Sequence, residues 1–136
     1  LPTEAQWEKA ARGRLVGKKY PWGDEDPICQ KGVSNGAQFS SCLTRGTVEV
    51  GRFSPNMYGL YDMAGNVWEW TLDWYQAIFY DSSPVSSPTG PSSGKQRVVR
   101  GGSWFNDAKY VRTAYRSRKD PTDRGDEVGF RCVRIP

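Results

Sequence analysis

The sequence contains no histidine, which removes the side chain that serves most often as a general base and as a transition-metal ligand. Cysteine is scarce, with three residues in 136, and their spacing matches no zinc-binding pattern. We find no glycine-rich loop that would cradle a phosphate and no nucleophile with a base beside it. No apolar run reaches the length of a membrane span, so we expect none. The common catalytic and membrane-protein classes therefore have no support.

Aliphatic residues are also few, because the hydrophobic fraction is 37% while aromatic residues alone make up 13%. We expect one domain whose core is built from a few large rings. Fifteen glycines and nine prolines indicate irregular structure between short strands, and the segment 81–94 is a serine- and proline-rich surface loop. With one clear helix and several short strands, the predicted class is α+β.

The net charge of +4 does not predict a nucleic-acid partner, because no basic helix and no phosphate-binding loop is present. The arginines gather late in the chain and acidic residues are interleaved with them, so we expect local ion pairs. These arginines are Arg97, Arg100, Arg112, Arg116, Arg118, Arg124, Arg131 and Arg134.

The stretch Gly59–Tyr75, GLYDMAGNVWEWTLDWY, holds three of the six tryptophans. Gly65-Asn66 predicts a turn, and the alternation that follows predicts a half-buried strand with Trp68 and Trp70 on its core side. Glu69 lies among these rings, and a buried carboxylate must be paired, protonated or bound to a cation. A salt bridge to an arginine and a calcium site with loop carbonyls both satisfy it, and spacing alone favours the salt bridge.

The remaining elements follow from shorter patterns. Residues 1–12 predict a helix, capped by Thr3 with Gln6 in a capping box and ended by Gly13. We expect an edge strand over 47–53, a strand over 97–104 broken at Gly101-Gly102, a short segment over 110–116 that is more strand-like than helical, and a last strand over 128–135.

The cysteines predict one bridge. Cys29 and Cys42 bracket a loop without a core of its own, and joining them would stabilise the fold by about 3 kcal/mol. The bridge forms in an oxidising compartment, and the sequence does not fix the compartment; we favour the periplasm or extracellular space over the cytoplasm. Cys132 is predicted to be an inert core residue in the last strand.

Five blocks together resemble the formylglycine-generating enzyme (sulfatase-modifying factor) family: LPTEAQWEKAARG, YPWGD, GLYDMAGNVWEWTLDWY, RVVRGGSW and GFRCVR, in the order of the family. The resemblance implies the loop-rich C-type-lectin-like fold of that family. It also implies that residues 1–136 are the C-terminal part of its domain. The chain begins without Met, so we expect a processed or partial product. Its partner would then be the N-terminal half of the domain or another protein chain.

The resemblance has two consequences for metals. The oxidases of the family bind copper through two cysteines shortly after the GGS block, but Trp104–Arg112 has none and Asn106 stands where the first would be. We therefore expect no copper and no oxidase activity. The family also binds calcium in the loop before the WEW strand, so calcium becomes the preferred partner of Glu69, as a structural ion. Its ligands would be Asp62, Gly65, Val67 and Glu69.

The leading hypothesis for function is a ligand- or protein-binding, or structural, subunit of a complex. Its predicted binding residues are Ser103, Trp104, Asn106, Tyr110 and Arg112, each of which has a core role as the alternative reading. The second hypothesis is a component of an oxygen-using enzyme, sulfoxide-synthase-like or formylglycine-generating-like. The catalytic metal ligands of that enzyme would lie on the missing half or on a partner chain.

Overall fold

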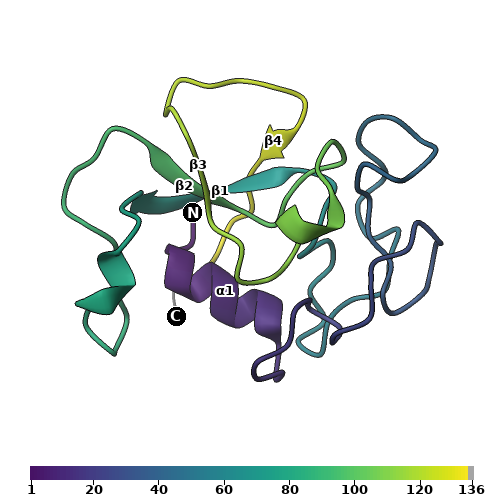
Figure 1. The fold of residues 1–136 in the computed structure, drawn as a ribbon, viewed down its shortest axis with the longest axis horizontal. Coiled ribbons are helices and arrows are strands. Elements are labelled where there is room, and N and C mark those ends of the chain that lie inside the picture. Colours follow the sequence, from purple (N-terminus) through teal and green to yellow (C-terminus); the bar gives the residue numbers. More distant parts are fainter. Residues whose placement is uncertain (135–136) are drawn as a thin grey trace.

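The computed structural model describes residues 1–134. A single α-helix lies against one face of a small curled sheet, and long loops form the rest of the domain (Figure 1). The elements are α1 (Glu4–Arg12), β1 (Trp68–Trp74), η1 (Phe79–Asp81), β2 (Arg97–Arg100), η2 (Ala108–Tyr110), β3 (Ser117–Lys119) and β4 (Val128–Gly129). This loop-rich arrangement confirms the predicted α+β class. Within residues 1–134 we find no helix long and apolar enough to cross a membrane.

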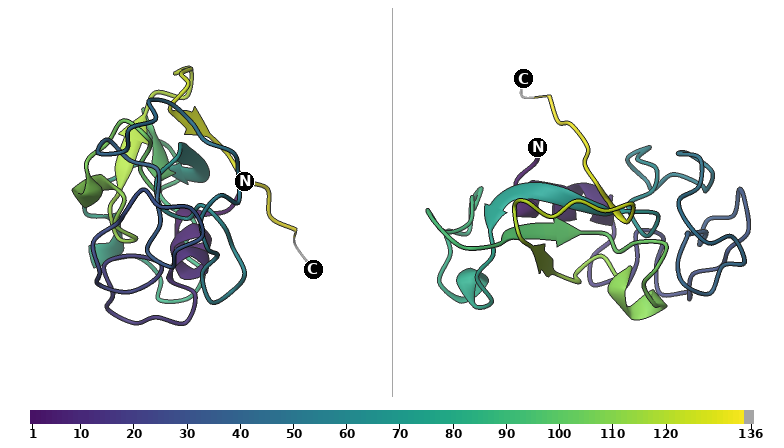
Figure 2. Two further views of the ribbon diagram at one scale, coloured as in Figure 1. Left: turned by 90° about the vertical axis from the view of Figure 1, so that its right-hand side faces the viewer. Right: turned by 90° about the horizontal axis from the view of Figure 1, so that it is seen from above.

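The sheet has the strand order β3-β2-β1-β4. Strand β2 pairs antiparallel with both β1 and β3, whereas β4 runs parallel to β1 at Trp68 and Glu69. Figure 2 shows the chain after β4 leaving the body of the domain. Most of the expected strand over 128–135 is therefore absent through residue 134, and Ile135 lies outside the described residues.

Helix α1 begins and ends as predicted. The Thr3 hydroxyl accepts a hydrogen bond from the Gln6 backbone (3.2 Å), and the Gln6 side chain accepts one from the Thr3 backbone (2.9 Å). Gly13, with φ of 61°, ends the helix. On the inner side Trp7 and Ala11 are buried and pack with Met63, so the helix packs on the turn before β1 through one ring and one small residue.

The alternation of β1 is present, but its principal buried face differs from the expected one. Glu69, Thr71 and Asp73 are buried, Trp70 is half-buried and Leu72 is 51% exposed. The polar face turns inward because each of its members has a partner. Glu69 accepts from Trp7 (2.6 Å) and Asp73 from the backbone of Glu4 (2.6 Å), while the Thr71 hydroxyl donates to the carbonyl of Val98 (3.2 Å). Trp68 is buried as predicted.

Other strand predictions fail for local reasons. Residues 47–53 are irregular, with a turn at Val50-Gly51, and form no strand. Residues 110–116 continue η2 into turns, so the strand there begins only at Ser117. Cys132 is exposed, and its prediction as a core residue is wrong, because the pairing of β4 with β1 ends at Gly129 and Cys132 lies beyond it.

The glycine pair after β2 is required by close packing, as the sequence indicated. Gly101 and Gly102 have φ of 94° and 75°. A Cβ on Gly102 would lie 2.6 Å from Cγ1 of Val111, and one on Gly101 would lie 3.2 Å from the ring of Trp7. Neighbouring protein atoms therefore account for both positions.

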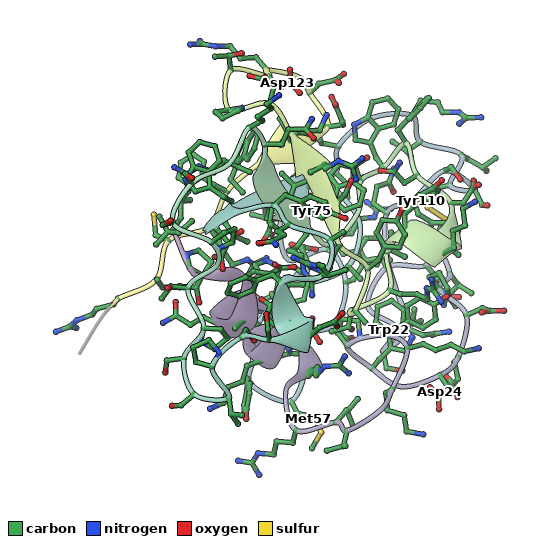
Figure 3. The ribbon with its side chains drawn as sticks, turned by 60° about the vertical axis from the view of Figure 1, so that its left-hand side comes forward. Trp22, Asp24, Met57, Tyr75, Tyr110 and Asp123 are labelled. Atoms are coloured by element: carbon green, nitrogen blue, oxygen red, sulfur yellow. A yellow bond between two sulfur atoms is a disulfide. The ribbon has the colours of Figure 1, made fainter. Side chains whose placement is uncertain are left out.

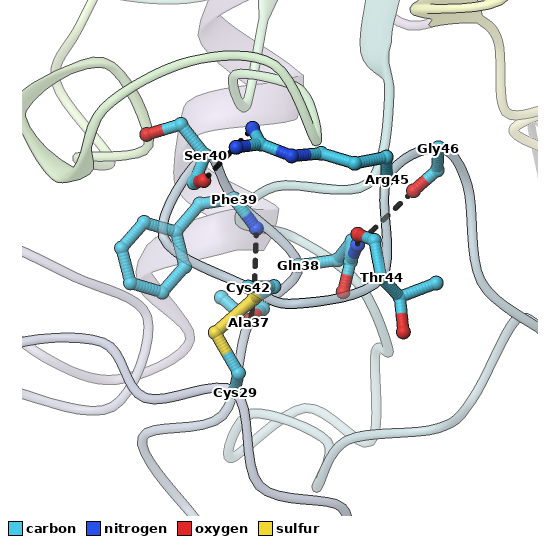
Figure 4. The surroundings of a disulfide bond; sticks show 9 residues. All are labelled: Cys29, Ala37, Gln38, Phe39, Ser40, Cys42, Thr44, Arg45 and Gly46. Carbon is cyan, nitrogen blue, oxygen red and sulfur yellow. Dashed lines mark hydrogen bonds between the residues drawn. A yellow bond between two sulfur atoms is a disulfide. The ribbon is translucent and has the colours of Figure 1, made fainter.

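The predicted disulfide between Cys29 and Cys42 is present, with 5.4 Å between the two Cα atoms (Figure 4). It joins the loop 25–45 to a second small core. That core contains Tyr20, Ala37, Phe39, Cys42, Ala64 and Val111. The bridge thus fixes a region that has little regular secondary structure.

Candidate functional site

The four residues predicted to bind calcium line one hollow of about 550 Å³ in front of β1. The turn before the strand has left-handed backbone angles, with φ of 55° at Asp62, 76° at Gly65 and 66° at Asn66. Oδ2 of Asp62 accepts the backbone N–H of Gly51 (2.7 Å), but its buried Oδ1 has no partner among the described residues. A carboxylate oxygen in that position suits a hard cation.

Glu69 is satisfied by protein groups in this structure. Both of its oxygens accept hydrogen bonds from Arg131, and Oε2 also accepts from Nε1 of Trp7 (2.6 Å). Burial by itself would lower the pKa of Arg131, but the hydrogen bonds and charge of Glu69, with the charge of Asp62, outweigh it and raise the pKa. The arginine therefore stays charged, and the Glu69–Arg131 ion pair corresponds to the salt bridge that spacing alone favoured.

The guanidinium of Arg131 also reaches the turn. It donates to the carbonyl oxygens of Tyr61 (3.1 Å) and Asp62 (3.4 Å) as well as to Glu69. The guanidinium thus contacts Asp62 and Glu69, two of the four residues that the calcium hypothesis assigns to this loop. Within residues 1–134 no group of three or more His, Cys, Asp or Glu side chains could hold a metal. A calcium ion here would have Asp62 and Glu69 as carboxylate ligands and backbone carbonyls for the rest.

The predicted binding residues after the glycine pair divide into separate groups. Ser103 is buried, and its backbone N–H and hydroxyl both donate to Oδ1 of Asn106 (3.1 and 2.7 Å). Asn106 in turn accepts the backbone N–H of Ser40 at its carbonyl (3.0 Å). These contacts close a turn, so Ser103 and Asn106 are brought together, with their polar groups directed mainly at each other.

Trp104, Tyr110 and Arg112 do not join that turn through side-chain contacts. Trp104 meets Phe105 edge to face at 5.7 Å, and its buried Nε1 has no hydrogen-bond partner in the described part of the chain. Tyr110 packs edge to face on Tyr115 at 4.9 Å. Arg112 is exposed and lines a different hollow, shared with residues 17–19. The five residues therefore do not converge on one cavity.

A buried charge network that sequence reasoning missed lies between α1 and the sheet. Arg100 is fully buried and pairs with Glu4 (3.3 Å) and Glu8. Arg116 makes a two-point contact with Glu4 (2.7 and 2.9 Å). The expectation of local pairs for the late arginines is wrong here, because these partners are about a hundred residues away in the sequence. The only signal was the presence of two glutamates one turn apart on the helix.

Asp73 lies beside this network and is buried with Oδ1 unpartnered among the described residues. Burial, and then the charge of Glu4, raise the pKa of Asp73, although the backbone N–H of Glu4 opposes the shift. Desolvation, and the charges of Glu4 and Asp73, also raise the pKa of the Tyr80 hydroxyl, which donates to Glu4 (3.3 Å). All these groups lie in the buried network between α1 and the sheet, so we assign them a structural role.

Comparison with known proteins identifies the family of this chain. The model of the sulfatase-modifying factor enzyme 1-like domain family matches residues 1–136. A formylglycine-generating enzyme of Streptomyces coelicolor is 39% identical over 98% of this chain, which covers 46% of that protein. The serine/threonine-protein kinase pkn1 of Chlamydia pneumoniae is 43% identical over 98% of this chain and 20% of its own length.

Among solved structures, Treponema denticola variable protein 1 superposes with a TM-score of 0.75 at 37% identity, over 96% of this chain and 45% of that one. The curved sheet and long loops are those of the C-type-lectin-like fold in this family. The chain spans about half the length of the formylglycine-generating enzyme that it matches. It belongs to the sulfatase-modifying factor enzyme 1-like family.

Proposed function

We propose that this chain is a binding or structural domain of its family and does not oxidise sulfatase cysteines. The proposal rests on the residue at position 106. Asn106 stands where the first copper-binding cysteine would be, and its side-chain oxygen accepts two hydrogen bonds from Ser103. An amide cannot form the thiolate that a cuprous ion prefers.

The three cysteines of the chain offer no substitute. Cys29 and Cys42 are joined to each other, and Cys132 lies beyond β4 on the exposed C-terminal segment. The similarity to pkn1 supports the same proposal, because there the region related to this chain occupies one fifth of a protein named as a kinase. A domain of this family can thus form a small part of a chain whose name describes another activity.

The test is incubation of the intact protein with copper, oxygen and a Cys-x-Pro-x-Arg peptide, followed by mass spectrometry. We expect no aldehyde, while the Streptomyces coelicolor relative serves as the positive control. Formylglycine above a no-protein blank would overturn the proposal. It would favour the second candidate, an oxygen-using enzyme whose metal ligands lie outside this chain. That candidate is supported by the 39% identity to an enzyme of twice the length.

We also propose a structural calcium ion in the loop 62–69. The support is the buried, unpartnered Oδ1 of Asp62 and the turn that places Asp62, Gly65, Val67 and Glu69 around one hollow. A bound calcium would supply positive charge to this loop and tie it to β1. Asp62 and Glu69 would hold the ion, and Arg131 would give up part of its contact with Glu69.

Exposed apolar side chains surround the same hollow. Val50 and Phe130 line it and are 80% and 68% exposed, and Tyr61 beside them is 47% exposed. We propose that the N-terminal half of the domain, or another protein chain, covers this face, since exposed apolar patches of this kind mark contact surfaces. Produced alone, residues 1–136 should then bind a hydrophobic dye or aggregate. A monomeric protein that melts cooperatively without binding dye would contradict this.

A further inference from the structure

A second hollow, of about 420 Å³, lies between two loop segments. One segment is 17–19 and the other is 112–116, and the backbone N–H of Thr113 holds them together by donating to the carbonyl of Lys19 (2.8 Å). Its lining consists of Gly17, Lys18, Lys19, Arg112, Ala114, Tyr115 and Arg116. It is thus a defined depression built by backbone pairing.

The lining carries four cationic side chains and no carboxylate. Two of the four are already compensated, since Arg116 pairs with Glu4 and Lys18 with the exposed Asp24 (2.6 Å). Lys19 and Arg112 form no ion pair within residues 1–134. The hollow therefore presents two positive charges outside these ion pairs, although the carboxylate of Asp24 also accepts the backbone N–H of Lys19 (3.1 Å).

Arg112 is anchored to the backbone through its Nε atom. Its Nε donates to the carbonyl of Lys109 (2.9 Å), and its two terminal nitrogens have no partner among the described residues. A guanidinium fixed at Nε keeps its terminal N–H groups in one plane, which suits two-point contact with an oxyanion. Lys19 adds a point charge from the facing segment.

The wall of the hollow is aromatic and well supported. The half-buried ring of Tyr115 packs on Tyr110 (4.9 Å between centroids) and on Trp68 of β1 (6.2 Å). In the view of Figure 3, Tyr110 and Asp24, the partner of Lys18, lie toward the same side of the molecule. Such a wall can take an apolar group that is attached to an anion.

We propose that this hollow binds the phosphate group of a small phosphate monoester. The positive charges of Lys19 and Arg112, which form no ion pair within residues 1–134, match in number the two negative charges of a phosphate monoester above its second pKa. A volume of about 420 Å³ exceeds what the phosphate needs, so the ester's organic group would lie against Tyr115. The proposal rests on the binding role proposed above and shares Arg112 with the predicted binding residues.

The test uses backbone NMR titrations of the intact protein at fixed ionic strength. The probes are inorganic phosphate and phenyl phosphate, because only the second carries a ring. We expect both to shift signals of residues 17–19 and 112–116, and phenyl phosphate to bind more tightly. Arg112→Gln should weaken binding about tenfold or more, because it removes charged hydrogen bonds. Lys19→Gln should weaken it less.

Lys31→Gln is the matched control, since it removes one exposed positive charge outside the hollow. It should leave the affinity unchanged within about twofold, as expected for an exposed, screened charge. Equal weakening by Lys31→Gln and Arg112→Gln would mean diffuse attraction and would overturn the proposal. So would the absence of saturable shifts at millimolar probe, or tighter binding of a short RNA with shifts spread beyond the hollow. None of these results would alter the outcome of the peptide oxidation test, so the two proposals can fail separately.

Discussion

The carboxylate of Glu4 and the guanidinium of Arg116 are joined at two points, 2.7 and 2.9 Å, although 112 residues separate them in the chain. The fully buried Arg100 also lies 3.3 Å from Glu4. One carboxylate from the first turn of α1 therefore compensates arginines from β2 and from the segment before β3. The helix is attached to the sheet through this charge as well as through Trp7.

Replacing Glu4 should be costly for that reason. Glu4→Gln leaves Arg100 buried with only Glu8 as a carboxylate, and we expect the free energy of unfolding to fall by about 3 kcal/mol, measured by urea denaturation. Lys18→Gln, which breaks an exposed pair with Asp24, is the control and should cost less than about 1 kcal/mol. Similar losses for the two variants would refute a special role for Glu4.

Gly102 and Gly59 form a matched pair for backbone and packing effects. Both have φ of 75°, but a Cβ at Gly59 would meet nothing within 4 Å, whereas one at Gly102 would lie 2.6 Å from Val111. Gly59→Ala should cost about 1 kcal/mol for the left-handed conformation alone. Gly102→Ala should cost about 1–3 kcal/mol more because of the overlap. Equal thermal denaturation midpoints for the two variants would show that the neighbours of Gly102 yield freely.

Reducing the Cys29–Cys42 bridge should destabilise the loop region. With a sequence separation of 13 between the two cysteines, the loop-entropy model gives about 3 kcal/mol. We expect the double variant Cys29→Ser/Cys42→Ser to unfold at lower urea concentration, by the same amount as the reduced parent protein. A reductant that changes nothing in the parent, once thiol titration confirms reduction, would contradict the stabilising role.

Sequence reasoning predicted those parts of the fold that depend on neighbouring residues. Each of these features depends on residues close in sequence or on a distinctive residue type. They are the Thr3–Gln6 capping box, the turn at Gly65-Asn66, the Cys29–Cys42 bridge and the close packing at Gly101-Gly102. The sequence predicts that the tryptophans form the inward face of β1, because only hydrophobicity distinguishes the two faces in a sequence. In the structure Glu69 and Asp73 can be buried since distant groups, Trp7 and the start of α1, provide their hydrogen bonds.

The candidate sites show the same limit. The residues proposed to bind calcium all lie within positions 62–69, so their spacing alone predicts that they lie close together. The pairing of Arg131 with Glu69 and the meeting of Lys19 with Arg112 depend on how loops return to the sheet, and no spacing pattern encodes that. Asn106 was recognised as a departure from the oxidase pattern, but its closed turn with Ser103 appears only in the structure.

The raised pKa of Asp73 makes stability depend on pH. Because its pKa in the folded protein is above the ordinary value of 3.8, the folded state binds this proton more strongly than the unfolded state does. Protonated Asp73 therefore stabilises the folded protein in acid. This stabilisation is lost as the pH rises from near 3.8 through the pKa of Asp73 in the folded protein. Asp73→Asn has no proton to lose, so the difference in unfolding free energy between variant and parent should grow in favour of the variant over that window. Parallel pH profiles would contradict this.

The calcium ion proposed for the loop 62–69 gives the last prediction. With Asp62 and Glu69 as its carboxylates, a site here should be weak, with a dissociation constant of roughly 0.1 to 1 mM. Calcium that binds only the folded state would stabilise it by about 2.7 kcal/mol at a hundredfold excess over that constant. Thermal melting of the intact protein in calcium and in chelator should therefore differ.

Asp62→Asn keeps the size of the side chain and leaves the Glu69–Arg131 pair in place, so it should reduce the calcium effect while the melting point in chelator stays near that of the parent. Glu69→Gln should abolish the calcium effect and also lower the melting point in chelator, because Arg131 loses its partner. Asp126→Asn, an exposed change outside the loop, is the control. Identical melting of the parent with and without calcium would mean that Arg131 alone compensates Glu69.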